Sequence, residues 1–186
     1  MLRMTLQEAK QYFDGHIVAL KKMCDDKSPW VFLCASCVIE YLSKLAYVDK
    51  HSSGERFEKF IRKYFPKKYQ EFKYKSGDMD LPKQMYHVLR CGLVHSFSFI
   101  PDNIGRQKGA RDRSLVLSHD EEHLSHYSSE RAPDACCLNA YKFVEDINSA
   151  MNKLFDEAEK HMPEKGKLTA NIEKWLNEHP PIMANI

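Results

Sequence analysis

The segment from Pro29 to Val48 restricts the fold more than any other, because apolar residues cover most of its circumference when it is drawn as a helix. Ser28 supplies an N-cap before it, and Pro29 suits a first helical turn. A helix that is apolar nearly all round needs neighbours on every side. We therefore predict that it lies at the centre of the fold, or is buried once more in an oligomer. Its apolar residues are Trp30, Phe32, Leu33, Cys34, Cys37, Val38, Tyr41, Leu42, Leu45 and Ala46.

Amphipathic helices are predicted on both sides of this segment. Apolar residues recur at steps of three and four from Leu2 to Leu20, and again from about Pro133 to His161. A shorter helix is expected to end at Pro66. Asp80 followed by Pro82 marks the start of another. A short accessory helix is expected over about residues 168–178.

A strand-like pattern interrupts the helices after residue 96. Phe97–Ile100 and Ser114–Leu117 are separated by a turn-rich connection, which predicts a small β-hairpin-like insertion around residues 97–118. The polar stretch 119–132 is expected to be irregular. The fold prediction is therefore all-α, a bundle of four principal helices with this insertion. The length favours one domain over residues 1–186, with a core over about 5–161.

The charge of the chain is nearly balanced, with 28 basic and 26 acidic residues. No overall field would attract nucleic acid or a membrane surface, so any nucleic acid would have to bind a local patch. No apolar run approaches the roughly 20 residues of a membrane-spanning helix. The first residues do not resemble a signal peptide either. A cytoplasmic location without membrane contact is the expectation.

The six cysteines do not predict a disulfide framework. Cys34, Cys37 and Cys91 lie among apolar residues in helical segments, where a free thiol acts as a small apolar side chain. A bond between Cys34 and Cys37, about one turn apart on one helix, would close a trivial loop. Buried, reduced thiols are expected, while a redox pair or metal ligation stays open as an alternative.

The segment Met85–Ser96 joins an apolar helical pattern to two side chains of functional chemistry. Four residues separate Arg90 from His95, and Gly92 lies between them. A helix that only filled a core would not need Arg90, and a solvated helix would not need Leu89. This arrangement resembles the R-x4-6-H motif of HEPN domains, a family of small helical proteins that includes many RNA-cleaving enzymes.

The resemblance implies a metal-independent endoribonuclease in a prokaryotic toxin or defence setting. Family members commonly dimerise and bring two copies of the motif into one cleft, and an antitoxin or another regulatory protein is an expected partner. Arg90 would clamp the scissile phosphate and His95 would transfer protons, without a cofactor. An acidic residue on the preceding long helix often orients the motif arginine, and Glu40 is the match here.

The chemistry of the two residue types fits RNA cleavage. An imidazole titrates near neutral pH, and a guanidinium binds phosphate oxygens with a permanent charge. One imidazole does not serve both ends of an in-line attack, which makes a dimer with two motifs the natural arrangement. On an ideal α-helix, Arg90 and His95 would lie about 140° apart and flank one face. Small residues between them would let a partner helix approach closely.

A non-catalytic alternative remains open. Cys91 stands where the family often has asparagine, and a thiol does not provide the hydrogen bonds of an amide. The chain would then be an HEPN-like module that binds RNA, a nucleotide or a protein partner through the same groove. Arg90 would form a structural salt bridge with Glu40, and His95 would make a hydrogen bond at a helix terminus.

Two further clusters, one of lysines and one of histidines, are candidate binding sites. Lys67, Lys68, Lys73 and Lys75 alternate with aromatic residues, a pattern that suits phosphate contacts and base stacking in RNA binding. The alternative is a solvated segment whose aromatic residues are buried. A second cluster, His119, His123 and His126, has the ligand type of a zinc site. A polar loop is preferred and no metal is expected, because Asp120 stands where the helical zinc motif needs glutamate.

Overall fold

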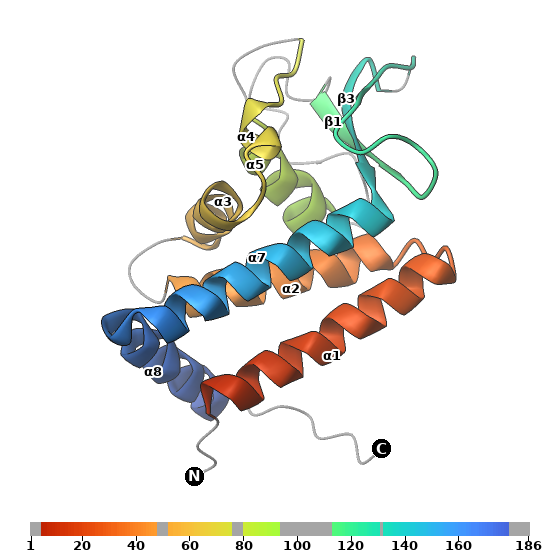
Figure 1. Ribbon diagram of the computed structural model, residues 1–186. Coiled ribbons are helices and arrows are strands. Elements are labelled where there is room, and N and C mark those ends of the chain that lie inside the picture. Colours follow the sequence, from red (N-terminus) through yellow and green to blue (C-terminus); the bar gives the residue numbers. More distant parts are fainter. Residues whose placement is uncertain (1–4, 48–51, 76–79, 94–112, 131, 179–186) are drawn as a thin grey trace.

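The computed structural model describes residues 5–47, 52–75, 80–93, 113–130 and 132–178. Helices dominate these residues, and a small three-stranded sheet lies at one end of them (Figure 1). Buried side chains of the helices and of the sheet form one hydrophobic cluster. The prediction of a mainly helical protein is confirmed.

Helix α1 (Leu6–Asp25) forms as its sequence pattern predicts. A capping box begins it: the Thr5 hydroxyl accepts the Glu8 N–H at 3.2 Å, and the Glu8 carboxylate accepts the Thr5 N–H at 2.7 Å. The residues at three- and four-residue steps face the core, including Phe13 and Ile17. Helix α1 runs alongside the other helices of the bundle in Figure 1, and its buried apolar residues face α2 (Val31–Ala46) and α7 (Ala140–Lys160).

Helix α2 (Val31–Ala46) is the central helix of the bundle. Its start is two residues later than Pro29, because the Ser28 hydroxyl accepts the Trp30 N–H and holds the preceding turn. The neighbours that cover its apolar surface are α1, α3 (Ser53–Tyr64), the π-helix η1 (Tyr86–Leu93), α7 (Ala140–Lys160) and α8 (Met162–Glu178). The predicted central position is confirmed. An oligomer is not needed to bury α2, because the chain itself surrounds it.

The middle of the chain follows its cap and stop signals closely. Ser52 and Glu55 form a capping box at the start of α3, and α3 ends just before Pro66. A single turn, α4 (Lys68–Glu71), follows. The Asp80 carboxylate then accepts the Lys83 N–H at 3.1 Å and begins α5 (Leu81–Met85), as predicted. Helix α5 leads without a break into η1, which the sequence did not predict.

The sheet differs from the predicted hairpin. Its strands are β1 (Arg113–Ser118), β2 (His126–Tyr127) and β3 (Asp134–Asn139), in the order β1-β3-β2. Strand β1 confirms the predicted strand at 114–117, but it pairs with β3 in parallel, and parallel neighbours are not a hairpin. The predicted strand Phe97–Ile100 lies outside the described residues. The short strand β2 falls in a stretch expected to be irregular.

Strand β3 also corrects the predicted start of the long C-terminal helix. Residues 134–138 are all buried, which is typical of a strand with neighbours on both sides. The helix signal begins only at Asn139, whose side chain accepts the Lys142 N–H and caps α7. Helix α8 begins at Met162, with only His161 between it and α7, so the predicted accessory helix at 168–178 is too short.

A buried polar network fastens the sheet region to the helices. The Tyr69 hydroxyl donates to the Asp146 carboxylate of α7 at 2.9 Å and lies 2.9 Å from Nε2 of His123. The backbone N–H of Asn139 donates to Nδ1 of His123 at 3.1 Å. Because Nδ1 accepts a hydrogen bond, the ring proton resides on Nε2, which faces Asp146 at 3.3 Å. The network ties α4, the loop after β1 and α7 together.

We predict that Asp146→Asn destabilises the fold by about 1–2 kcal/mol at pH 7, because buried donors lose a charged acceptor. Burial raises the pKa of Asp146, but hydrogen bonds from His123 and Tyr69 and the charge of Lys68 outweigh it and lower this pKa. A carboxyl with a lowered folded pKa stabilises the fold above its unfolded pKa of about 3.9, and this effect is lost as the pH falls through the folded value.

Urea unfolding of wild type and Asp146→Asn at several pH values measures this effect. The difference between them should shrink as the pH falls below about 4. Asp156→Asn, at an exposed position on the same helix, is the control and should change stability by less than about 0.5 kcal/mol. Equal effects of the two substitutions at pH 7 would refute a stabilising network.

Candidate functional site

Arg90 and Glu40 meet at the interface between η1 and α2. The guanidinium Nε and the carboxylate Oε2 form an ion pair, and the two side chains are only 22 % and 11 % exposed. Lys44, one turn further along α2, approaches the other carboxylate oxygen at 3.6 Å. The pairing of Arg90 with Glu40 is the one that the sequence predicted. A single carboxylate therefore faces two cations at the edge of the core.

The helix that carries Arg90 is a π-helix rather than an α-helix. Helix η1 spans Tyr86–Leu93 and follows the ordinary turns of α5. The π form, with i→i+5 hydrogen bonds, is rare and is frequent at functional sites. The predicted angle of 140° between Arg90 and His95 lies outside the described residues, because η1 ends at Leu93. Within η1, residues five apart in the sequence come close to a common face.

Tyr86 and Cys91 show the effect of this geometry directly. They are five residues apart, and the Cys91 thiol lies near enough to the Tyr86 hydroxyl to affect its pKa. The pKa of Tyr86 is raised, first by burial and then by Cys91, while Arg90 opposes the shift. Glu40 raises the same pKa, so all four groups lie near one another. The thiol after the motif arginine thus lies beside the hydroxyl of a neighbouring tyrosine.

Gly54, at the start of α3, makes room for the Tyr86 ring. A Cβ added at Gly54 would lie 2.9 Å from Cε1 of Tyr86, closer than real side chains approach. The Phe57 ring lies 5.7 Å from the Tyr86 ring between centroids. The ring of Tyr86 therefore extends from η1 and packs against α3. No periodic pattern in the sequence predicts this contact, although a glycine in the first helical turn is typical of a close approach.

Of the two histidines in the motif segment, the structure describes His87 but not His95. His95 lies outside the described residues, so the structure brings Arg90 to Glu40 but does not describe the imidazole of the pair. His87 lies on η1, with its ring 5.6 Å from that of Tyr86. Burial, and then the charge of Lys83, lower the pKa of His87. His87 is therefore a neutral neighbour of the site at pH 7.

The two small motif residues that the structure describes, Cys91 and Gly92, do not form an open surface. Gly92 is buried within the chain, and Cys91 is partly buried. The expectation that these residues let a partner helix approach closely loses its basis at Gly92, because residues of the same chain already cover it. A dimer contact at the motif would have to use the exposed part of Arg90 and its surroundings.

The cysteines are free thiols rather than crosslinks. All six cysteines are free. Cys34 and Cys91 are partly buried and Cys37 is exposed, so the expectation of full burial is wrong for these three. Burial raises the pKa of Cys34 and of Cys37, and Arg90 only partly opposes this shift at Cys37. These thiols are protonated at neutral pH and are poor nucleophiles.

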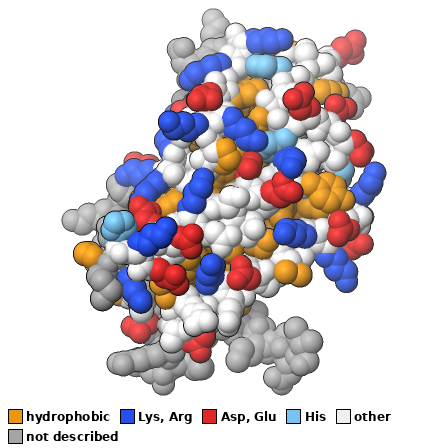
Figure 2. Space-filling model, in the orientation of Figure 1, with side chains coloured by type: hydrophobic (Ala, Val, Ile, Leu, Met, Phe, Trp, Pro, Cys, Tyr) orange, Lys and Arg blue, Asp and Glu red, His pale blue; other side chains and the backbone are white. Residues whose placement is uncertain are grey.

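The basic aromatic segment separates into an exposed and a buried part. Lys67, Lys68, Lys73 and Lys75 are exposed, and Lys68 lies 3.7 Å from Asp146. The alternating aromatic residues Tyr69, Phe72 and Tyr74 are buried. They do not present faces for base stacking, which fits the alternative of a solvated segment over a buried stripe. On the face shown in Figure 2, basic and acidic side chains are interspersed rather than gathered.

The three histidines after β1 have separate surroundings. His123 belongs to the buried network with Asp146, and the His126 ring lies 4.6 Å from the Phe72 ring. The His119 ring packs near those of Phe32 and Tyr141. Within the described ranges, no three metal-ligating side chains are gathered into a site. His123 is thus a structural residue with both ring nitrogens engaged.

Comparisons of the chain with models of protein families, with curated proteins and with solved structures gave no match. Among the helices of the described segments, none has the length and apolar character to cross a membrane. The site is therefore interpreted from its own geometry.

We predict that Glu40→Gln lowers the free energy of unfolding by about 2 kcal/mol, below the 3–5 kcal/mol of a fully buried pair, because both side chains keep some contact with water. Arg90 would then keep its charge at the edge of the core without a counter-charge. Urea unfolding at pH 7 measures this change.

Lys44→Gln is the matched control, because Lys44 faces the same carboxylate from a side chain that is 38 % exposed. It should cost less than about 1 kcal/mol. If both substitutions had the same effect, Arg90 would not be the main partner of Glu40.

Proposed function

We propose that this chain is an HEPN-like, metal-independent endoribonuclease that acts as a homodimer on RNA. The observation that carries the proposal is the Glu40–Arg90 ion pair on a π-helix, at the position where the resemblance places the motif arginine and its orienting carboxylate. A helix that only filled the core would need neither a charged side chain paired with a carboxylate nor the rare π-helical form.

Arg90 is the phosphate-binding residue of this proposal. Its guanidinium has five N–H donors in a fixed plane, and its Nε atom lies in the ion pair with Glu40. The side chain is 22 % exposed, so part of the guanidinium reaches the surface. Glu40 is a positioning residue, since it fixes the guanidinium from the core side. A positive charge at this point stabilises the dianionic phosphorane that forms during attack.

His95 is the proton-transfer residue. The 2'-hydroxyl of the substrate attacks the neighbouring phosphorus while the bond from phosphorus to the 5'-oxygen breaks. One imidazole accepts the proton of the 2'-hydroxyl, and the partner's His95 donates a proton to the leaving 5'-oxygen. The products are a 2',3'-cyclic phosphate and a 5'-hydroxyl.

A second candidate function is a non-catalytic module that binds RNA through the same surface. The observation that favours it is the free, partly buried thiol of Cys91 directly after Arg90. A thiol offers a substrate no amide hydrogen bonds beside Arg90. The exposed lysines Lys67, Lys73 and Lys75 would contact phosphates under either function.

We predict that wild type cleaves single-stranded RNA and that His95→Ala lowers the rate at least about 100-fold, because proton transfer contributes 10²–10⁴ to such reactions. Product ends should be 2',3'-cyclic phosphates, and EDTA should leave the rate unchanged. Gel assays and mass spectrometry of the products measure both.

His126→Ala, at an exposed histidine far along the chain, is the control and should cleave like wild type. RNA that binds wild type but stays intact would establish the binding module instead. Loss of cleavage in EDTA would exclude the metal-independent mechanism.

We predict that the protein is a dimer at micromolar concentration, because the two proton transfers need two imidazoles on opposite sides of the phosphate. Light scattering should give twice the mass of one chain, and the specific activity should fall on dilution as the dimer dissociates. A monomer that cleaves RNA with undiminished specific activity would eliminate the composite site and leave a single imidazole to do both transfers.

A further inference from the structure

Within α2, one stripe of the helix surface faces solvent while most of the circumference is buried. The partly or fully exposed residues of this stripe are Leu33, Cys34, Cys37, Tyr41 and Lys44. At 100° per residue they fall within an arc of about 100°. Apart from Ala46 in the last turn, the other residues of α2 are buried. We call these five exposed residues the α2 stripe.

One edge of the α2 stripe is cationic. Arg90 of η1 and Lys44 both face the carboxylate of Glu40, which leaves one net positive charge at this edge. Burial raises the pKa of Cys37, and the charge of Arg90 opposes this rise, so the guanidinium lies close to the exposed thiol in the middle of the stripe. Arg90 therefore borders a surface that solvent reaches.

Aromatic rings lie at the opposite edge. The centroid of the Tyr41 ring is 4.4 Å from that of the Trp175 ring of α8, and both side chains are only partly buried. Tyr12 of α1 is 37 % exposed. Burial raises the pKa of Tyr41, and the nearby Tyr12 and Cys37 raise it further. The same thiol thus lies near the aromatic rings on one side and near Arg90 on the other.

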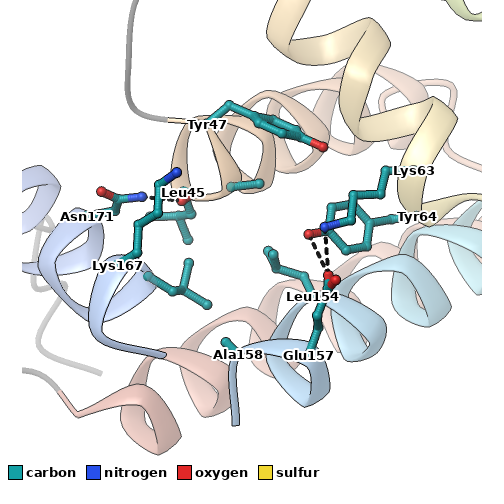
Figure 3. Close-up of a pocket in the computed structure, with 11 residues that line it drawn as sticks. Leu45, Tyr47, Lys63, Tyr64, Leu154, Glu157, Ala158, Lys167 and Asn171 are labelled. Atoms are coloured by element: carbon teal, nitrogen blue, oxygen red, sulfur yellow. Dashed lines mark hydrogen bonds and ion pairs between the residues drawn. The ribbon is translucent and has the colours of Figure 1, made fainter. Parts of the chain in front are cut away.

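Helix α8 is fixed beside the α2 stripe by a second contact. Where α8 reaches the ends of α2, α3 and α7, the four helices form a pocket, and Asn171 donates there to the Leu45 carbonyl at 2.7 Å (Figure 3). Trp175 follows Asn171 by about one turn of α8, and Tyr41 precedes Leu45 by about one turn of α2. The next turn of each helix therefore brings the two rings together, and helical backbones rather than loops set their positions.

The combination of cations and exposed rings on one surface is typical of sites for single-stranded nucleic acid. In such sites cationic side chains contact the phosphates, and aromatic side chains stack on the unpaired bases. The lysine-rich segment 67–75 offers only the first of these, because Tyr69, Phe72 and Tyr74 are buried. The α2 stripe offers both, and it does so directly beside the arginine of the candidate site.

We propose that a single strand of RNA lies across the α2 stripe, with a phosphate at Arg90 and Lys44 and a neighbouring base against Tyr41, Tyr12 and Trp175. This inference rests on the proposed function, because it describes how the substrate reaches the same arginine. It adds a requirement that a phosphate contact alone does not impose, namely an unpaired base next to the bound phosphate.

The fluorescence of Trp175 tests this contact directly. The chain has two tryptophans, so Trp30→Phe leaves Trp175 as the fluorophore. The probe is a short oligoadenylate with 2'-O-methyl groups, which lacks the attacking hydroxyl and stays intact whether or not the protein is a nuclease. It should quench Trp175 in a saturable way. A strand of the same length without bases should bind at least about fivefold more weakly, because it cannot stack.

Tyr12→Ala should weaken binding of the same oligoadenylate at least about fivefold, since a stacking ring is lost. The matched control is Tyr127→Ala on β2, because Tyr127 is 38 % exposed and Tyr12 is 37 % exposed. The control should bind like wild type. Anisotropy of a labelled strand measures both affinities in proteins that keep both tryptophans.

The outcomes separate this inference from the proposed nuclease. Absence of saturable quenching, equal binding of strands with and without bases, or equal affinities of Tyr12→Ala and Tyr127→Ala would each overturn the inference. Cleavage of RNA by wild type together with any of these results would keep the nuclease and remove the α2 stripe as its RNA-binding surface. Base-dependent quenching by the modified strand, with natural RNA left uncut, would support the stripe and refute the nuclease.

Discussion

The charge of Glu40, on the central helix of the bundle and at the edge of its core, is the constraint on which the candidate site depends. Glu40 lies on α2, which other helices surround, and its carboxylate is largely removed from water. A carboxylate in such a place needs cations, and Arg90 and Lys44 provide them. The ion pair sets the position of η1 against α2. The buried carboxylate of Glu40 thus fixes the position of Arg90, whose side chain is partly exposed at the surface.

The π-helix adds a second constraint to the same place. In η1, residues five apart come together, as Tyr86 and Cys91 do. The Tyr86 ring in turn occupies the space that Gly54 leaves open on α3. Arg90 is therefore held by an acid on one helix and by a helical form whose side chains are anchored on another. Catalytic sites need such preorganisation, and a helix that only filled the core would gain nothing from it.

The polar residues outside this site divide by whether their hydrogen-bonding capacity is used. His123 attracts attention in the sequence, but both of its ring nitrogens are engaged with Asn139 and Asp146, so it serves the fold. The state of its donors and acceptors, rather than its residue type, identifies His123 as a structural residue.

The sequence alone determined the elements whose signals are local. The periodic stripes of α1, α2 and α7, the capping of α5 by Asp80 and the end of α3 at Pro66 all follow from neighbouring residues. Glu40 was also foreseeable as the partner of Arg90, because an acid on an apolar helix needs a cation. His95, by contrast, lies outside the described residues, and its role stays a prediction.

Tertiary structure decided what local signals do not encode. The run 134–138 could form a helix or a strand, and only parallel pairing with β1 made it a strand. The burial of Tyr69, Phe72 and Tyr74 depended on which side of their segment the helices cover. The π-helix depended on packing against α2 and α3, and the pocket on the meeting of four helices. In each case the deciding contacts come from residues far apart in the chain, and their free energies are absent from any short window of sequence.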